Sequence, residues 1–292
     1  MYLTVEKSYH GCITDRGHTP FLTAEHHTRL EVSKLQKDTI HVVSLSGGKD
    51  STAMLLRMLE EGMPVDRILF CDTGMEFPGM YEHIDKLEKY IGFPIERLKA
   101  PYTFMYLFSE HNPKRKNEEL AGLKGFSWPG PLSRWCTSRM KTDIIDAYIR
   151  KLEKQYTVEQ YIGIAADEPQ RIKNFHYPLV DWGMTEADCL KYCQDCGFDW
   201  NGLYEIFSRV SCWCCPLQSL EELRKLRKHF PDLWNRLREM DDSTWRTFRA
   251  DYSVRQLEQR FDFEEEWLKS HDSIKTKAFF TALKQKSQEV TP

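Results

Sequence analysis

Residues 42–55 read VVSLSGGKDSTAML and join a β-branched run to a helix-forming run through a Ser/Gly turn. Ile40, Val42 and Val43 predict a buried strand, and the apolar residues spaced three and four apart after Asp50 predict a helix. In a strand–loop–helix unit, the loop N–H groups and the positive end of the helix dipole meet at one point. The stretch therefore predicts a phosphate-binding loop.

The overall composition narrows the possible classes of protein. A chain of 292 residues with 41% apolar residues can form one large domain, or one domain with a smaller attachment. Its net charge of -3 predicts no general attraction to nucleic acid or to anionic membranes, so such a partner would need a local basic patch. No apolar run approaches about 18 residues and residues 1–22 lack the order of a secretion signal. We therefore expect a cytoplasmic protein without a membrane partner.

The pattern along the chain predicts the fold class. Further strands are expected at residues 67–71, 95–98 and 159–166, and helices at residues 81–91 and 183–197. Strands that alternate with helices predict an α/β fold, with a doubly wound, mostly parallel sheet covered by helices on both faces. Ligands of such sheets bind beyond the carboxyl ends of the strands.

Changes in composition predict three regions. Residues 1–38 read as an N-terminal extension, residues 39–216 as a nucleotide-binding domain with a cysteine site, and residues 217–292 as a C-terminal helical region. Residues 114–128 are charged and contain glycine, which favours a long mobile loop.

The glycine loop does not have the Walker spacing, because only two glycines directly precede Lys49. Adjacent glycines allow backbone N–H groups to surround an anion, the serines supply hydroxyls, and Lys49 can neutralise a phosphate. Asp50 is assigned to a Mg²⁺ ion that bridges the phosphates. A tight turn with a helix cap is the alternative, but it leaves the lysine and the hydroxyls unexplained. The predicted nucleotide-binding residues of the loop are Ser46, Gly47, Gly48, Lys49, Asp50 and Ser51.

Several further motifs follow the loop in order. They are DTGMEFP at 72–78, RWCT at 134–137, GIAADE at 163–168 with Arg171, YPL at 177–179 before Asp181-Trp182, and SCWCCP at 211–216. This ordered set, which covers about residues 39–216, resembles the phosphoadenosine phosphosulfate reductase family of PP-loop ATP pyrophosphatases. The resemblance implies the adenine nucleotide alpha hydrolase-like fold. The family includes sulfonucleotide reductases, the small subunit of sulfate adenylyltransferase and the ATP pyrophosphatase of DNA phosphorothioation.

Three departures distinguish members of that family. Sulfonucleotide reductases use a cysteine in a C-terminal Glu-Cys-Gly motif and usually alter the loop lysine, whereas here no cysteine follows Cys215 and Lys49 is intact. Ala165 stands where the family commonly carries an arginine that contacts phosphate or substrate. The resemblance thus implies an ATP-using member such as the phosphorothioation enzyme, which adenylates an acceptor, releases pyrophosphate and supports sulfur transfer.

That chemistry assigns roles to charged residues. Attack on the α-phosphate builds negative charge, which backbone donors, cations and Mg²⁺ can stabilise. The candidate catalytic residues are Lys49, Asp50, Arg134, Lys141 and Arg171, although each of the last three could be a solvated surface charge. Asp72 follows a buried strand and is a predicted metal or ribose partner, or else a turn-forming residue before Gly74; Thr73 and Gly74 would shape the adenosine pocket.

The cysteines predict a metal site. The chain has nine and no export signal, which favours reduced thiols over a disulfide framework. Cys212 and Cys215 have the spacing for one metal centre, and the resemblance places Cys136 near them. Three thiolates would hold a 4Fe–4S cluster with one iron open to sulfide, whereas Cys214 as a fourth ligand would close it. Zn²⁺ bound by four cysteines and reduced core cysteines are the alternatives.

A second cysteine group, Cys189, Cys193 and Cys196, has the C-x3-C-x2-C spacing of radical S-adenosylmethionine enzymes. We expect instead a helix that buries these small side chains on its core face.

The leading hypothesis is an ATP pyrophosphatase with a sulfur donor that the sequence does not identify. A sulfonucleotide reductase with a thiol from elsewhere and a non-catalytic nucleotide-binding module of a larger assembly with partner proteins are the alternatives. The acceptor could be a small sulfur-containing or sulfate substrate, or a DNA or tRNA, which would need a basic surface. The residues that could form such a surface are Lys114, Arg115, Lys116, Arg134, Arg139, Lys141 and 224–227.

Overall fold

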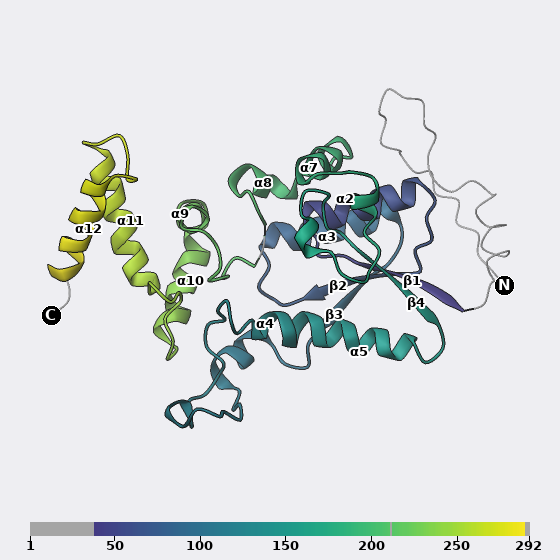
Figure 1. The fold of residues 1–292 in the computed structure, drawn as a ribbon, viewed down its shortest axis with the longest axis horizontal. Coiled ribbons are helices and arrows are strands. Elements are labelled where there is room, and N and C mark those ends of the chain that lie inside the picture. The colour runs from purple at the N-terminus through teal and green to yellow at the C-terminus, as the bar shows by residue number, and fades with distance from the viewer. Residues whose placement is uncertain (1–37, 211, 290–292) are drawn as a thin grey trace. The chain divides into compact units, whose positions relative to one another are not determined.

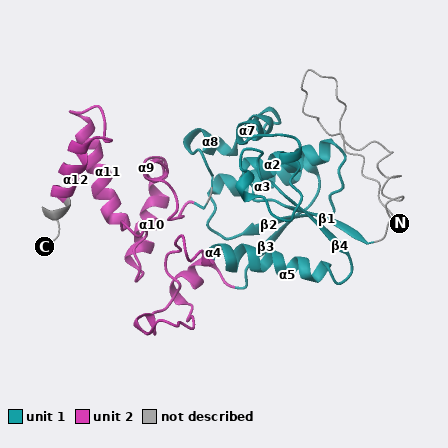
Figure 2. Cartoon of the chain, in the orientation of Figure 1, with its two compact units in different colours: residues 1–101, 136–212 teal, residues 102–135, 213–292 magenta. Residues whose placement is uncertain are grey.

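The computed structural model describes residues 38–210 and 212–289, so the predicted extension at 1–38 lies outside the described residues except for Asp38. The chain divides into two compact units (Figure 2). The first unit comprises residues 1–101 and 136–212, and the second comprises residues 102–135 and 213–292. The domain boundaries predicted at residues 38 and 216 stay predictions.

The first unit is built on four parallel strands in the order β3-β2-β1-β4. The strands are β1 (Thr39–Ser44), β2 (Arg67–Asp72), β3 (Ile95–Lys99) and β4 (Thr157–Ile162). Val42 and Val43 are fully buried in β1, as expected for an apolar strand covered on both faces. The predicted α/β fold with a parallel sheet is confirmed.

The strand predicted at residues 159–166 is wrong at its end, because β4 stops at Ile162. Beyond it, Ile164 N donates back to Ile162 O at 3.0 Å, and Gly163 lies against the backbone of Ser51. The chain therefore leaves the sheet where it meets the glycine loop.

Helices cover both faces of this sheet. Figure 1 shows α2 (Lys49–Glu60), α3 (Pro78–Ile91) and α7 (Glu186–Asp195) on one side and α5 (Asp143–Leu152) on the other. Ile149 of α5 packs against Val42 and Leu69 of the sheet. α3 begins three residues earlier than predicted, because Pro78 occupies its first position, where proline is favoured. Two short helices, α6 (Pro178–Asp181) and α8 (Leu203–Ile206), flank α7 in sequence.

The second unit is helical, which confirms the predicted C-terminal helical region. Its helices are α9 (Leu220–His229), α10 (Pro231–Asp242), α11 (Val254–Leu268) and α12 (Lys277–Glu289). Trp128 Nε1 donates to Asp241 Oδ1 at 2.9 Å, and this buried bond attaches residues 102–135 to α10.

Shorter helical turns along the chain are Tyr106–Glu110, Glu118–Leu120, Trp135–Thr137, Ser138–Thr142, Pro169–Arg171 and Trp200–Gly202.

A search of the described residues for a membrane span found no helix with the necessary length and apolar character.

Candidate active site

The glycine loop connects the carboxyl end of β1 to the start of α2. Gly47 has φ +81°, in the left-handed region that favours glycine, and a Cβ there would lie 2.5 Å from Met80 Sδ. Gly48 is the N-cap of α2, so the first N–H groups of that helix, which have no partner within the helix, lie next to the loop. The conformation of the loop and its contact with Met80 therefore both require glycine at position 47.

The hydroxyls of the loop hold its shape. Ser51 Oγ accepts from Ser46 N at 3.1 Å, lies 2.9 Å from Ser46 Oγ and donates to Gly48 O at 3.1 Å. These bonds join the last residue of the loop, Ser51, to Ser46 and Gly48. Ser46 and Ser51 therefore fix the shape of the loop backbone, and the binding of an anion there stays a prediction.

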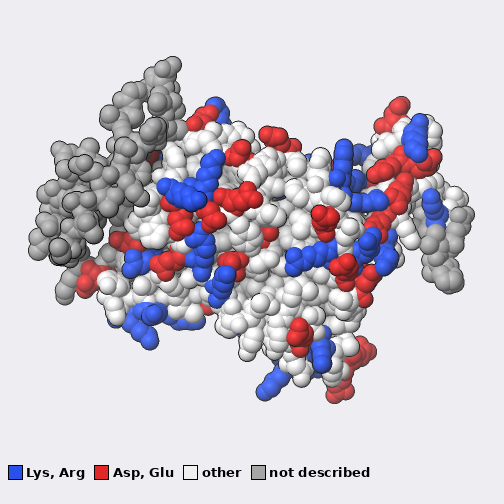
Figure 3. Space-filling view, turned by 180° about the vertical axis from the view of Figure 1, so that it is seen from behind, with Lys and Arg blue, Asp and Glu red and all other residues white. Residues whose placement is uncertain are grey.

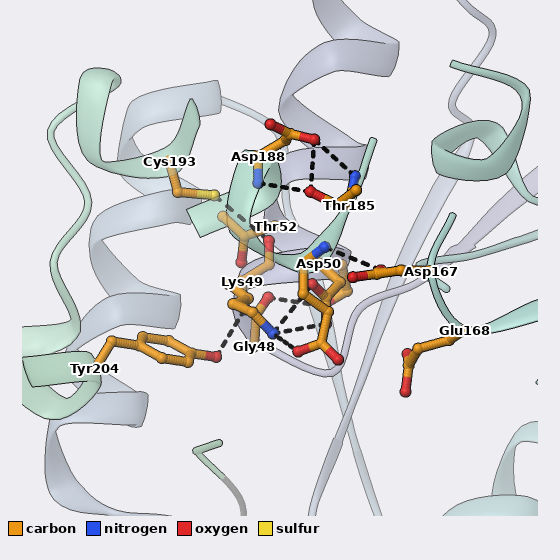
Figure 4. Close-up of polar contacts among 12 residues, drawn as sticks. Gly48, Lys49, Asp50, Thr52, Asp167, Glu168, Thr185, Asp188, Cys193 and Tyr204 are labelled. Carbon is orange, nitrogen blue, oxygen red and sulfur yellow. Dashed lines mark hydrogen bonds and ion pairs between the residues drawn. The ribbon is translucent and has the colours of Figure 1, made fainter. Parts of the chain in front are cut away.

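Lys49 is the buried cation of this loop (Figure 4). Its Nζ lies 3.3 Å from Asp50 Oδ1 and donates to the carboxylate of Glu186, the first residue of α7. Burial opposes the charged form, but the hydrogen bond to Glu186 and the field of Asp50 prevail and raise the pKa of Lys49. The side chain of Lys49 therefore stays positively charged.

Asp50 keeps one oxygen outside its hydrogen bonds. Lys49 Nζ donates to Oδ2 at 3.4 Å, whereas the buried Oδ1 forms only the ion pair with Lys49 and accepts no hydrogen bond within the described part of the chain. Burial raises the pKa of Asp50 against the opposing field of Lys49, and the nearby carboxylates of Glu186 and Glu168 raise it further. A buried acceptor oxygen among an excess of carboxylates is the environment that suits a hard cation such as Mg²⁺. The residues present therefore fit the predicted ion.

Residues 193–204 brace the loop through three hydrogen bonds. Trp200 Nε1 donates to Gly47 O at 2.7 Å, Tyr204 Oη accepts from Lys49 N at 2.9 Å, and Cys193 Sγ donates to Lys49 O at 3.4 Å. Sequence reasoning assigned none of these three to the loop, nor Glu186. They lie more than 130 residues beyond Lys49 and no motif marks them.

The cysteines of α7 are core residues. Cys189 and Cys193 are fully buried, and burial raises the pKa of Cys189 to about 12 and that of Cys193 as well. The predicted helix and its cap are present, since Thr185 and Asp188 form a capping box. The interpretation of this group as buried helix-face cysteines is thus confirmed for Cys189 and Cys193, while Cys196 is half-buried.

His83 supports α2 from α3. Its Nε2 lies 3.0 Å from Thr52 Oγ1, and its ring stacks on Trp200 with centroids 4.3 Å apart. Burial lowers the pKa of His83 from 6.5 to about 3. The unfolded chain consequently binds a proton in this pH range that the folded chain does not bind.

We expect the first unit to lose stability as the pH falls below about 6.5, because His83 must be neutral in the fold. Linkage gives a loss of about 2 kcal/mol between pH 7.5 and pH 5 from this group. Hydrogen exchange of the α2 and α3 amides measures it. His83→Gln should flatten this profile above pH 5, and a variant profile as steep as that of the wild type would contradict the assignment.

Asp72 lies at the carboxyl end of β2 in a fixed turn. Its Oδ1 accepts from Gly74 N and from the Tyr81 hydroxyl, both at 2.9 Å, and Lys99 Nζ lies 3.3 Å from Oδ2. Burial works against the charged form, but these hydrogen bonds lower the pKa of Asp72. The turn-forming role is observed, whereas the contacts of Asp72, Thr73 and Gly74 with a nucleotide stay predictions.

The remaining predicted catalytic residues lie in different places. Lys141 Nζ lies 3.2 Å from Glu76 Oε1, and Arg171 pairs with Glu168, whose field reaches Asp50. Arg134 is exposed and belongs to the second unit. Arg171 is thus paired with a carboxylate that contributes to the field at Asp50.

The predicted metal ligands are divided between the units. Cys136 and Cys212 are half-buried in the first unit, while buried Cys214 and half-buried Cys215 belong to the second. Cys212 Sγ donates to Glu76 Oε1 at 3.4 Å. A set of thiols alone fits iron–sulfur or zinc chemistry. No group of three or more His, Cys, Asp or Glu side chains arranged for one ion is found among residues 38–210 and 212–289. The ligand set stays a prediction from sequence.

Most cations of the predicted basic surface already have acidic partners. Figure 3 shows Lys and Arg interspersed with Asp and Glu on the face in view. The pairs are Arg139–Asp143, Lys141–Glu76, Arg224–Glu264, Lys225–Glu221 and Arg227–Asp262. Paired charges give a weak field at the surface, so these residues do not favour a nucleic-acid acceptor over a small one.

Several known proteins are similar to this chain. The profile described as the phosphoadenosine phosphosulfate reductase domain matches residues 40–218, more than half of the chain. An uncharacterised protein of Methanocaldococcus jannaschii is 25% identical over 205 residues, which are 66% of this chain and 45% of that protein. The chain thus spans less than half of the length of that relative.

Two solved structures are also similar. A phosphoadenylyl-sulfate reductase from Candida auris in a phosphate complex aligns with 15% identity and a TM-score of 0.43, over 67% of this chain and 98% of that one. The U34-tRNA thiolase NcsA from Methanococcus maripaludis, with its 4Fe–4S cluster, aligns with 16% identity and a TM-score of 0.33, over 82% of this chain and 79% of that one.

Proposed function

The chain belongs to the phosphoadenosine phosphosulfate reductase domain family, and from that premise we propose that it is an ATP pyrophosphatase that adenylates an acceptor and supports sulfur transfer. The observation that carries this proposal is the loop from Ser46 to Ser51. It combines a backbone whose shape is held by its serines, a buried lysine, and a buried carboxylate oxygen without a hydrogen bond from the described residues. A triphosphate would bring negative charge to Lys49, and Mg²⁺ would bring positive charge to the Asp50 oxygen.

The proposed reaction transfers AMP. An acceptor oxygen forms a bond to the α-phosphorus, the bond from this phosphorus to the bridging oxygen breaks, and pyrophosphate leaves with the electron pair. The acceptor proton passes to water. Lys49 and the first N–H groups of α2 would stabilise charge on the departing pyrophosphate, and Asp50 would hold Mg²⁺, which neutralises the phosphate oxygens when bound. A sulfur nucleophile would then displace AMP from the acceptor.

The direct experiment supplies ATP and Mg²⁺ with tRNA, DNA or a small sulfur compound, without and with sulfide, and measures pyrophosphate and AMP. The proposal expects pyrophosphate with one acceptor class, and an equal amount of AMP when sulfide is present. Release of sulfite from a sulfonucleotide and a thiol, without ATP cleavage, would establish the reductase alternative. ATP binding without cleavage in the presence of every acceptor would favour the nucleotide-binding module.

The proposal includes a 4Fe–4S cluster held by Cys136, Cys212 and Cys215, with Cys214 as a potential fourth ligand. The all-thiol set supports it, and Zn²⁺ is the alternative. When bound, an open iron of the cluster would bind sulfide. The role of the chain is to supply the thiolates and to shield the site from water.

We expect protein purified without oxygen to contain iron and sulfide, and Cys212→Ala to lose most of both, because a cluster with three protein ligands tolerates no further loss. Iron and sulfide analysis with a visible spectrum measures this. Cys189→Ala, which alters a buried thiol of α7, is the matched control and should keep the wild-type metal content. Stoichiometric zinc in the wild type, without iron, would exclude the cluster.

A further inference from the structure

Two donors of Lys49 have partners within the protein itself. The Glu186 carboxylate accepts from Lys49 Nζ, and the Tyr204 hydroxyl accepts from Lys49 N at 2.9 Å. An ammonium and a backbone N–H at the start of a helix are the donors that an incoming phosphate would use. Glu186 begins α7 and Tyr204 lies in α8, so two successive helices occupy the positions expected for the ligand.

The two members of the Lys49–Glu186 pair differ in their access to water. The side chain of Lys49 is 8% exposed and that of Glu186 is 43% exposed. Lys49 therefore needs an anionic partner, whereas Glu186 can rotate into solvent. The backbone of Glu186 is fixed separately, because its N–H donates to Asp167 Oδ1 at 3.1 Å and Thr185 caps the helix. The carboxylate can thus leave Lys49 while α7 stays in place.

From this geometry we propose that Glu186 is an internal anion that occupies the phosphate position at Lys49 until a polyphosphate displaces it. This inference rests on the proposed function, since it takes the loop as the triphosphate site. Displacing Glu186 adds the same cost to the binding of every anion that pairs with Lys49. Weakly binding anions such as phosphate and sulfate are then excluded at millimolar concentrations, whereas a triphosphate with more contacts still binds.

The size of the effect follows from the fraction of molecules in which Lys49 is accessible. The apparent Kd rises by the inverse of that fraction. If the Lys49–Glu186 pair is broken in about a tenth of the molecules, binding is about tenfold weaker than at a Lys49 that is always accessible. Glu186→Gln removes the charge without changing the shape of the side chain. It should lower the Kd of inorganic pyrophosphate about five- to tenfold in the absence of Mg²⁺.

Titration calorimetry with pyrophosphate and with ATP, each without Mg²⁺ and then with it, tests the inference in the full chain. Asp195→Asn, at the other end of α7, is the matched control, because it removes the same charge from the same helix and should leave both Kd values near those of the wild type. Glu186→Ala is a second variant that also releases Lys49 and should act in the same direction.

The outcomes separate this inference from the proposed function. Tighter binding by both Glu186 variants, but not by Asp195→Asn, supports the internal anion. Unchanged or weaker binding by those variants overturns it, even where wild-type ATP binding leaves the proposed function standing. Weaker binding only when Mg²⁺ is present would show that Glu186 serves the metal instead. Absence of any binding in all four proteins would overturn both proposals.

Discussion

Replacement of Lys49 by methionine is expected to reduce the rate of pyrophosphate release from ATP by at least about 100-fold, the usual cost of removing one donor that stabilises transition-state charge. Lys49 is the buried cation of the loop, and its pKa is raised, so it is charged throughout the working pH range. Methionine keeps much of the length of the side chain and removes the charge. Initial rates of AMP and pyrophosphate formation measure the effect.

The control for this prediction is Lys191→Met. Lys191 is an exposed residue of α7 that pairs with Asp195, so its loss removes the same charge from the same unit without altering the loop. It should retain the wild-type rate. If Lys49→Met also retained that rate, the loop would be a capped turn without a catalytic role, and the proposed function would lose the observation that carries it.

Gly163→Ala is expected to weaken ATP binding by about 100-fold, because it moves the start of α2. A Cβ at Gly163 would lie 2.6 Å from Ser51 Cα and 2.7 Å from Ser51 N, and both are backbone atoms. Met54 and Leu55 of α2 are fully buried, so the helix cannot retreat without disturbing the core. A displacement of about 1 Å in a site can cost about 100-fold in function.

The same change should lower the free energy of unfolding by about 1–3 kcal/mol, the usual cost of overpacking. Gly197→Ala separates the two effects, because Gly197 has φ +84° and a Cβ there would meet no atom of the described residues within 4 Å. It should lose about 1–2 kcal/mol through backbone strain and still bind ATP. Calorimetry and denaturant unfolding of both variants provide the comparison. Normal ATP binding by Gly163→Ala would show that the loop does not depend on this contact.

Much of the fold could be predicted because the patterns that encode it are local. The β-branched runs gave β1 and β2, and the Thr185–Asp188 pair gave the start of α7, because a strand or a capped helix needs only neighbouring residues. The end of β4 was wrong because an apolar run continues past Gly163, and nothing local shows that Ser51 lies against it.

By itself, the sequence determined the parallel α/β sheet, the glycine loop between β1 and α2, and the family to which the chain belongs. Only the tertiary structure decided what surrounds Lys49. Glu186 lies 137 residues and Tyr204 lies 155 residues beyond it. Such pairs arise when whole helices pack against each other, and the free energy of that packing depends on the shape of the assembled core rather than on any spacing along the chain.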